Sequence, residues 1–536
     1  MGWRTLEATL DRVARPGASS GPALPEPTPA DTAGWTASAI SAFWAGDFHA
    51  VRQAAHRARD VAVVDLDRAL ASGAGGLAFA GMEDPTWPAP WADAPAGATG
   101  GTDRQRSFAQ YLLAESALAS GRLDLASAFT SAGGRWHQPW LDSPFSVIML
   151  SCRVRTAAFS GRIDDAAAQL PELEELGRLH GLEDLATAVA SLVTGNADDA
   201  DRARAEISRL IDSPLSTEDY VGRGVRLLAA FGAVALGDIE QAATLILSAG
   251  DPGLSRLTII DRALAIELLT AAAIADDDAE AALAWLAQLE LMDTSTIAAA
   301  VVERTRARVA LLAGDAHLAA RLAESAAHAA RAQGRVVEAA ESEVVLARAR
   351  IATDQVAEAA RSLRAAVSQA DAVGHRAVRR SATEALSHAR RRLPPPRGSG
   401  WDSLSPREIE VAQLTARGQD SGDIAALLYL SPATVRVHIS RVLAAFGVPT
   451  CTALIAVVAP TLPPGEQSPL PPLSPRRAHV VELVAQGWGN VRIAQSLGIS
   501  VKVVERHVGD ALRLWNARGR AQLASMWWAA ARDRGS

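Results

Sequence analysis

Apolar residues recur three and four positions apart over most of the chain between Trp35 and Arg392. This interval matches the turn of an α-helix, so each segment presents one apolar face. Ala, Leu, Glu and Arg dominate the same stretch, and the alternating β-branched runs that are typical of strands are almost missing. The pattern predicts an all-α body over residues 35–392.

One short phrase returns along this body at a regular interval. It is a small residue, then Gly with Asp, Arg or Asn, and then a helix start that usually carries Ala five positions after the Gly. Gly tolerates the left-handed turn between two antiparallel helices, and an acidic residue favours the next helix start. Copies begin at Gly46, Gly121, Gly161, Gly195, Gly237 and Gly314, with weaker ones at Asp276 and Asp354, and from the second onward the copies lie 34 to 42 residues apart. Such a period predicts stacked helix hairpins.

This body resembles the tetratricopeptide-like (TPR-like) helical repeats, and it is similar to the repeat regions that precede the DNA-binding domain in large regulators of the MalT type. The resemblance implies a helical-repeat solenoid, although the units are longer than the standard of about 34 residues. The stretch from Gly73 to Thr102 interrupts the repeats, and four tryptophans lie around it. We expect these to pack the first repeats, and lining an effector pocket is the alternative. They are Trp87, Trp91, Trp136 and Trp140.

Stretches rich in Pro, Gly and Ser divide the chain. Consecutive prolines lack amide donors and favour an extended backbone, so such stretches are typical of linkers. The predicted parts are a disordered or partly helical leader at 1–34, the repeat domain at 35–392, a linker at 393–400, a small domain at 401–459, a Pro-rich linker at 460–472 and another small domain at 473–536.

The first small domain carries clear helix signals. Ser405-Pro406 and Ser431-Pro432 each place a capping Ser before a Pro at the first helical position, and Gly418 marks a helix end between them. Two helices joined by a tight turn, the second of them carrying Arg, form a helix-turn-helix (HTH). The order and spacing closely resemble the LuxR/FixJ-type DNA-binding domain of bacterial transcription regulators, which implies a small four-helix fold.

The same text returns 69 positions further on, without a gap. The matches fall on caps, glycines and positions in the helix cores, as expected for two domains of one fold. Identical residues recur at Leu473, Ser474, Pro475, Arg476, Val480, Leu483, Ala485, Gly487, Ile493, Ala494, Leu497, Ser500, Val504, His507 and Leu512. We call residues 401–459 copy 1 and residues 473–536, which diverge more from the family, copy 2.

The resemblance implies that DNA is contacted from the start of the second HTH helix. Family members place a Thr-Val-Lys/Arg-x-His string there, and copy 1 keeps it. Arg makes a bidentate contact with guanine, and Val meets the methyl group of thymine. The expected contacts of copy 1 are Thr434, Val435, Arg436, Val437, His438, Ser440 and Arg441, and those of copy 2 are Arg476, Arg492, Lys502, Arg506, His507 and Arg520.

Charge and motif favour different copies. Copy 1 holds four Arg against five acids, a net charge of −1, whereas copy 2 holds ten basic residues against four acids, a net charge of +6. Attraction to phosphate therefore favours copy 2. Copy 2 also places Glu505 and Asp510 on its second HTH helix, where they would face a polyanion. A degenerate duplicate that forms a dimerisation or autoinhibitory surface is the alternative for copy 2.

Composition argues against several other classes of protein. Of 53 basic residues only Lys502 is Lys, so residues 1–501 lack the Lys that Walker loops, kinases and pyridoxal enzymes require. Cys152 and Cys451 have no partners at metal-binding spacing. We therefore expect no enzyme activity, no cofactor and no metal. A charged N-terminus and the lack of a long apolar run predict a cytoplasmic protein without a membrane partner.

These observations predict a bacterial transcription regulator. We expect the repeat body to sense a small molecule or a protein, and the HTH pair to bind double-stranded DNA, with RNA polymerase as a further partner. Either one chain engages two adjacent sites through its linked copies, or each copy pairs with a second chain in a homodimer. The alternative function is a TPR-like protein-interaction scaffold with vestigial HTH domains.

Overall fold

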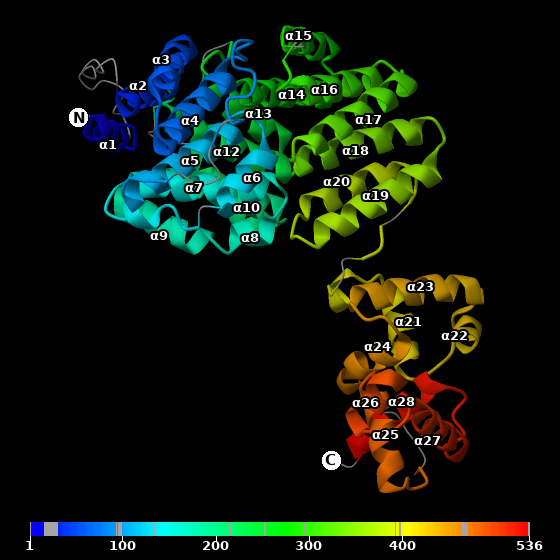
Figure 1. The fold of residues 1–536 in the computed structure, drawn as a ribbon. Coiled ribbons are helices and arrows are strands. Elements are labelled where there is room, and N and C mark those ends of the chain that lie inside the picture. Colours follow the sequence, from blue (N-terminus) through cyan, green and yellow to red (C-terminus); the bar gives the residue numbers. More distant parts are fainter. Residues whose placement is uncertain are drawn as a thin grey trace. The chain divides into compact units, whose positions relative to one another are not determined.

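The structure, a computed structural model, describes residues 2–533 except for 16–30, 93, 95–98, 133, 212, 214–215, 251–252, 293–294, 392, 396–397 and 463–469. Within these ranges every regular element is helical, which confirms the all-α prediction, and the chain divides into two units, Met1–Arg392 and Leu393–Ser536 (Figure 1). The predicted leader and both predicted linkers lie partly outside the described residues. None of the described helices is long and apolar enough to cross a membrane.

The N-terminal unit is a succession of helix hairpins. Its elements are α1 (Gly2–Val13), α2 (Thr32–Ala45), α3 (Phe48–Val61), α4 (Asp65–Gly81), α5 (Asp103–Ala119), α6 (Leu123–Ala132), η2 (Gln138–Trp140), α7 (Phe145–Phe159), α8 (Ile163–Ala167), α9 (Leu170–His180), α10 (Glu183–Asn196), α11 (Ala200–Ile211), α12 (Tyr220–Ala235), α13 (Ile239–Ser248), α14 (Ile259–Ala275), α15 (Ala279–Glu290), α16 (Ala299–Leu312), α17 (Ala316–Ala332), α18 (Val336–Ala352), α19 (Val356–Asp371) and α20 (Ala377–His388). This arrangement is compatible with the predicted repeat solenoid.

The recurring Gly-Asp phrase builds the turns of these hairpins. Gly237 has φ +80° at the end of α12, and the Asp238 side chain then accepts a hydrogen bond from the Gln241 amide at the start of α13. The same left-handed glycine and capping aspartate occur at Gly46-Asp47 and Gly314-Asp315. Glycine adopts a positive φ without side-chain strain. When an N-cap residue follows it directly, the chain ends one helix and begins the next within a few residues.

One copy of the phrase works differently from the prediction. Gly195 lies inside α10, and Asp198 takes the left-handed conformation of the turn with φ +63°. Gly195 is instead required by close packing, because a Cβ there would lie 2.6 Å from the carbonyl oxygen of Gly232 in α12. Gly195 itself therefore serves a crossing of two helices, while α10 ends one residue later at Asn196 and Asp198 makes the turn.

The irregular stretch near the N-terminus is shorter than predicted. Gly73, Gly75 and Gly76 belong to α4, so only residues 82–102 separate α4 from α5. A Cβ at Gly73 would lie 2.6 Å from Leu112 Cγ of α5, which shows how closely the two helices approach.

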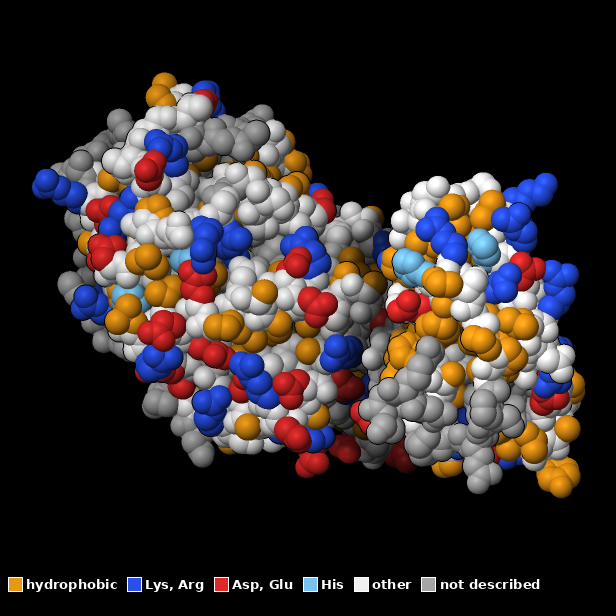
Figure 2. Space-filling model, turned by 90° about the horizontal axis from the view of Figure 1, so that it is seen from below, with side chains coloured by type: hydrophobic (Ala, Val, Ile, Leu, Met, Phe, Trp, Pro, Cys, Tyr) orange, Lys and Arg blue, Asp and Glu red, His pale blue; other side chains and the backbone are white. Residues whose placement is uncertain are grey.

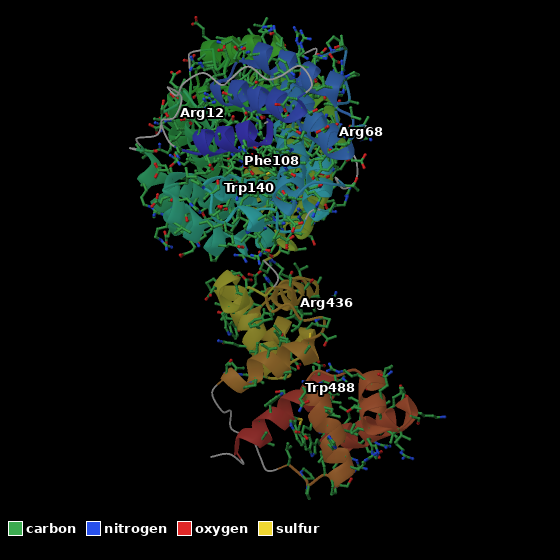
Figure 3. All side chains as sticks on the ribbon, turned by 60° about the vertical axis from the view of Figure 1, so that its left-hand side comes forward. Arg12, Arg68, Phe108, Trp140, Arg436 and Trp488 are labelled. Carbon is green, nitrogen blue, oxygen red and sulfur yellow. The ribbon has the colours of Figure 1, made fainter. Side chains whose placement is uncertain are left out.

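The tryptophans around this stretch are packing residues. Trp91, Trp136 and Trp140 are buried in the main core, and Trp87 is partly buried against it. The Trp140 indole donates a hydrogen bond to the Arg104 carbonyl oxygen at 3.1 Å, and Phe108 lies beside its ring (Figure 3). The prediction that these residues pack the first repeats is confirmed.

The repeats wind round until late turns touch early ones. The Asp124 amide at the start of α6 donates to the Gln333 carbonyl oxygen at 3.2 Å, between α17 and α18. The Ile163 amide donates to the carbonyl oxygen of Val373 at 3.0 Å, and the Arg376 amide donates to that of Asn196 at 2.9 Å. The late turns near residues 333 and 373–376 are thus joined by backbone hydrogen bonds to the earlier turns near residues 124, 163 and 196.

The C-terminal unit contains two domains of four helices each. Copy 1 holds α21 (Pro406–Ala416), α22 (Ser421–Leu428), α23 (Pro432–Ala445) and α24 (Cys451–Val458), and copy 2 holds α25 (Pro475–Ala485), α26 (Asn490–Leu497), α27 (Val501–Leu514) and α28 (Arg520–Asp533). Their cores use matched positions 69 residues apart, because Val411, Ile424, Val435 and Val442 of copy 1 correspond to Val480, Ile493, Val504 and Ala511 of copy 2, all buried.

Candidate nucleic-acid interface

Each copy presents a short helix, a tight turn and a capped second helix. In copy 1 the Ser431 hydroxyl accepts a hydrogen bond from the Thr434 amide at 3.1 Å, and Pro432 begins α23. In copy 2 the Ser500 hydroxyl accepts one from the Val503 amide at 3.4 Å. The capped ends fix where α23 and α27 begin, and a second helix placed in this way is the element that enters the major groove in HTH proteins.

The outer face of α23 carries four of the predicted contacts. Thr434, Arg436, Val437 and Ser440 are exposed, and the Val437 side chain is 59% exposed. Among the described residues Arg436 has no hydrogen-bond or ion-pair partner, so its guanidinium is available to a ligand (Figure 3). Thr434, Val437 and Ser440 follow each other at intervals of three residues, and Arg436 lies four residues before Ser440, so the four side chains share the outer side of the helix.

Val435 does not belong to this face. Its side chain is 0% exposed and packs with Val411 and Ile424 in the core of copy 1. The structure therefore places Val435 apart from the other predicted DNA contacts, on the face of α23 that packs against the domain core.

Two further predicted contacts are turned toward α21. Arg441 Nε lies 2.9 Å from the Glu408 carboxylate, and an Arg441 terminal nitrogen donates to the Leu393 carbonyl oxygen at 3.1 Å. His438 Nδ1 lies 3.9 Å from the same carboxylate and is half-buried. Burial works to raise the pKa of Glu408, but hydrogen bonds from Ser405 and the Arg441 charge hold it below its usual value. Arg441 and His438 thus lie between α23 and α21, with Arg441 paired to Glu408 inside copy 1, and their contact with DNA stays a prediction.

Copy 2 has the same anchor with the charges exchanged. Arg477 of α25 donates to the Asp510 carboxylate of α27 at 3.0 Å, and these positions correspond to Glu408 and Arg441. Arg513 contacts the same carboxylate at 2.5 Å. The Arg513 hydrogen bond is the main cause of a lowered Asp510 pKa, and the charges of Arg477 and Arg513 add to it against the opposing effect of burial. Asp510 is therefore neutralised inside copy 2 and does not repel a polyanion as expected from the sequence.

Two predicted contacts of copy 2 have partners within the domain, and a third is half-buried in it. Arg476 donates to the Leu497 carbonyl oxygen at 3.2 Å, the counterpart of the bond from Arg407 to Leu428 in copy 1. Arg520 is half-buried and donates to Asn490 Oδ1 at 2.7 Å. His507 is half-buried, and burial lowers its pKa. These residues organise copy 2, although the Arg476 side chain stays exposed at its edge.

The remaining contacts of copy 2 face solvent. Lys502 and Arg506 are exposed on α27 and have no hydrogen-bond or ion-pair partner in the part of the chain that the structure describes. The guanidinium carbon of Arg492 lies 3.8 Å from the centroid of the Trp488 ring, which orients an otherwise exposed cation. In Figure 2 Lys and Arg side chains gather along one edge of the C-terminal unit.

Comparisons with known proteins agree with this geometry. Residues 402–458 and 471–527 each match the family model described as bacterial regulatory proteins, luxR family. The C-terminal unit carries two LuxR-family HTH domains. This finding confirms the family resemblance on which the sequence prediction rested.

Curated relatives match over part of the chain. A protein of Mycobacterium tuberculosis named HTH-type transcriptional regulator Rv0890c is 39% identical over 79 residues, which are 14% of this chain and 9% of that protein. A protein of Mycobacterium bovis named HTH-type transcriptional regulator Mb0914c is 38% identical over 79 residues, with the same coverage. The chain thus spans about a tenth of the length of these relatives.

Sequence reasoning missed one exposed residue of the first LuxR-family domain. Tyr429 stands in the turn between α22 and α23 with φ +55°, and its side chain is 95% exposed. The corresponding residue of the second domain is Gly498, also left-handed with φ +63°. An aromatic residue in a position suited to Gly would have been recognised by aligning the two LuxR-family domains with each other.

Proposed function

We propose that the protein is a cytoplasmic bacterial transcription regulator that binds double-stranded DNA through its two LuxR-family domains. The observation that carries the proposal is an exposed Arg436, without a partner among the residues that the structure describes, on a capped second HTH helix of a LuxR-family domain. The function is binding, and no catalytic step is assigned to any residue. RNA polymerase is the further partner that such a regulator would contact.

The two domains offer different chemistry to base edges. Arg436 matches the acceptors of guanine and Val437 the methyl group of thymine, while Thr434 and Ser440 suit phosphate or base contacts. On α27, Lys502 and Arg506 attract phosphate and guanine, and Glu505 accepts from the amino group of cytosine.

The exchanged ion pair supports a working second domain against the vestigial alternative. Replacing Glu408 by Arg alone, or Arg441 by Asp alone, would set like charges against each other between the first and third helices. Copy 2 differs from copy 1 at both positions and keeps the attraction as Arg477–Asp510. Compensation of this kind argues that the position of α27 matters to the protein.

The N-terminal unit offers a site for the effector. It encloses a cavity of about 790 Å³, within the size range of small-molecule sites. Phe159, Phe231 and Leu264 contribute to its apolar wall, together with residues of α18 and α20. The turns that precede α18 and α20 also carry the hydrogen bonds to the earlier turns. A ligand bound in this cavity would therefore strengthen or weaken those turn-to-turn contacts.

The polar groups of the cavity favour an amphipathic small molecule. Arg155 forms an ion pair with Glu115 at 2.6 Å, and Arg308 forms one with Glu267 at 3.3 Å, so these charges are already balanced. Burial raises the pKa of Asp261 and of Glu341, which also line the cavity. A ligand that donates hydrogen bonds to such carboxyl groups and fills the apolar wall would be recognised.

The test is selection of genomic DNA fragments by the full chain, followed by mobility-shift titration at several salt concentrations. We expect specific binding that weakens as salt rises, since basic residues neutralise phosphates. Failure to bind any fragment with salt sensitivity would favour the protein-interaction scaffold. Metabolite mixtures that raise the melting temperature of the full chain, and then change its affinity for the selected DNA, would identify the effector.

A further inference from the structure

The two copies pack against each other through an apolar surface. Ile455 and Ala459 of copy 1 and Ala485 and Ala524 of copy 2 form one buried cluster, which Trp528 covers. Figure 1 shows α24 and α28 where the two domains meet. Ile455 is 0% exposed and does not belong to the separate core cluster of copy 1, so its burial comes from copy 2.

The contacts are reciprocal. A Cβ at Gly418 of copy 1 would lie 2.9 Å from Gln522 Cα in α28, and a Cβ at Gly487 of copy 2 would lie 3.0 Å from Ala453 Cα in α24. Gly487 is Gly418 shifted by 69 positions, and Gln522 is Ala453 shifted by the same 69. Each copy therefore uses the same two places, the end of its first helix and the face of its fourth, to meet the other.

A contact in which both partners use the same surface is isologous, the type that relates two subunits by a two-fold axis. Here the two partners are parts of one chain. The fourth helices α24 and α28 cover each other, so the surface through which either copy would meet a second chain in this way is already occupied.

One ion pair across this contact is not reciprocal. Arg518 of copy 2 forms an ion pair with Asp423 of copy 1, and it lies 3.5 Å from Asp420. The positions that correspond to Arg518 and Asp423 in the other copy are Pro449 and Arg492, which form no such pair. Arg518 is thus used between the copies, and the two halves are not interchangeable.

We propose that a single chain binds DNA as an internal pseudo-dimer, with α23 and α27 on two unlike half-sites in opposite orientation. The proposal rests on the proposed DNA-binding function. Operator symmetry mirrors protein symmetry, so a two-fold related pair of HTH domains reads an inverted repeat. The half-site of copy 1 meets Arg436 and Val437, whereas that of copy 2 meets Lys502, Glu505 and Arg506. The repeat is therefore imperfect in sequence.

The packing itself is tested without DNA in the full chain. In a Cys451→Ser background, Ala453→Cys and Gly487→Cys bring two thiols together, because the ideal Cβ of residue 487 lies 3.3 Å from the Cβ of Ala453. Disulfides need a similar separation of about 3.8 Å. We expect mild oxidation to give a cross-linked monomer, and chains with only one of the two substitutions to stay uncross-linked. Gly487 has φ +84°, so Gly487→Cys costs stability by itself, and the double variant is first shown to be folded by its urea midpoint. A disulfide-linked dimer, or no disulfide in the folded double variant, overturns the internal pairing whether or not the protein binds DNA.

The reading of two half-sites is tested with the same full chain on its selected DNA. One chain per duplex is expected by mass measurement of the complex. Inserting 5 base pairs between the half-sites turns one of them to the opposite face of the duplex, and a fixed pair should then lose about 100-fold in affinity. Two chains per duplex, or an affinity that is unchanged by the insertion, overturns the proposal, since independent copies on a flexible linker would follow the displaced half-site.

A matched pair of variants separates the interface from the fold. Ile455→Glu places a charge in the contact, while Val457→Glu places it on the same helix at a residue that is 50% exposed. We expect Ile455→Glu to bind both original and extended DNA with the same weakened affinity, and Val457→Glu to behave as the unchanged protein. If the cross-linked form of the cysteine variant keeps full affinity, the paired arrangement is the one that binds. Loss of affinity on cross-linking would contradict it.

Discussion

Arg436 is the residue on which direct recognition by copy 1 depends, because its guanidinium is exposed and has no partner among the described residues. We expect Arg436→Ala to weaken binding to the selected site by about 1–3 kcal/mol and to relax the sequence preference of one half-site. The measurement is titration of the full chain against the site and its single-base variants. Arg417→Ala, which changes an exposed Arg at the end of α21, is the control and should leave the preference unchanged. Equal loss on every sequence would mean that Arg436 touches only phosphate.

Tyr429 holds a backbone conformation that its side chain disfavours. A left-handed conformation costs a residue with a Cβ about 1–2 kcal/mol, and glycine avoids most of this cost. Since the Tyr429 side chain is 95% exposed, its removal loses little packing. We expect Tyr429→Gly to raise the free energy of unfolding of copy 1 by about 0.5–1 kcal/mol in urea titration. Gly498→Ala in copy 2 should do the opposite, and a destabilised Tyr429→Gly would show that the ring makes a favourable contact.

At the scale of elements, the ion pair between the first and third helices sets the position of each recognition helix. Exchanging the charges in copy 1 with Glu408→Arg and Arg441→Asp together should reproduce the arrangement of copy 2. Each single change leaves like charges opposed, and Glu408→Arg also removes the capping box with Ser405. We expect a coupling energy of about 1 kcal/mol in a double-mutant cycle followed by thermal unfolding. Additive effects would show that the pair does not hold α23.

Sequence patterns predicted the elements well where the signal is local. The Gly-Asp phrase predicted hairpin turns at Gly46, Gly237 and Gly314, because a left-handed residue and an N-cap act within a few residues. Gly195 carried the same phrase but serves a helix crossing, and the sequence alone does not show which helix comes close. The turn-to-turn hydrogen bonds could likewise not be predicted from the sequence, because they join residues that lie far apart in the chain.

The DNA contacts stay a prediction, and the structure divides the predicted residues into exposed ones and ones that pack or pair within their domain. The family resemblance supplied all of these residues. Arg436 and Val437 are exposed, whereas Val435, which belongs to the family string, is buried, and Arg441, which follows that string, pairs with Glu408. The burial of Val435 and the partner of Arg441 depend on α21, which lies far away in sequence. Aligning the two copies with each other would have revealed the exchanged charges and thereby the anchoring role of Arg441.

At the scale of the whole molecule, the two units should respond differently to acid. His375 lies in the turn between α19 and α20, is 3% exposed, and burial lowers its pKa to about 4. In the unfolded chain a histidine titrates near 6.5, so above that pH neither state binds the proton and stability is unaffected. As the pH falls from about 6.5 to 4, only the unfolded state is protonated, and the N-terminal unit loses stability.

The size of this loss of stability follows from the difference between the pKa values of His375 in the folded and unfolded states. At pH 5 it amounts to roughly 2 kcal/mol relative to pH 7. We expect the urea midpoint of the N-terminal unit to decrease less between pH 7 and pH 5 in His375→Gln than in the unchanged protein. The control is His49→Gln, which changes an exposed histidine and should leave the pH dependence of the midpoint unchanged. An unchanged slope in His375→Gln would mean that His375 is not the group that titrates.

The net charges of the N-terminal and C-terminal parts of the chain have opposite signs. Residues 1–400 hold 39 basic and 50 acidic residues, a net charge of −11, whereas residues 401–536 hold 14 and 10, a net charge of +4. The overall charge of −7 therefore conceals a C-terminal part suited to a polyanion. The sequence alone predicted this contrast, since it needs no knowledge of packing.

The backbone hydrogen bonds from Ile163 to Val373 and from Arg376 to Asn196 have a consequence for how this protein can evolve. An open solenoid lengthens or shortens by whole units, because each repeat meets only its neighbours. In this chain, a hairpin added or deleted between these turns would shift the turn at 373–376 away from Ile163 and Asn196. The amides and carbonyl groups of these backbone hydrogen bonds would then lose their partners. Descendants of the protein are therefore expected to vary in sequence and in loop length while the number of their hairpins stays constant.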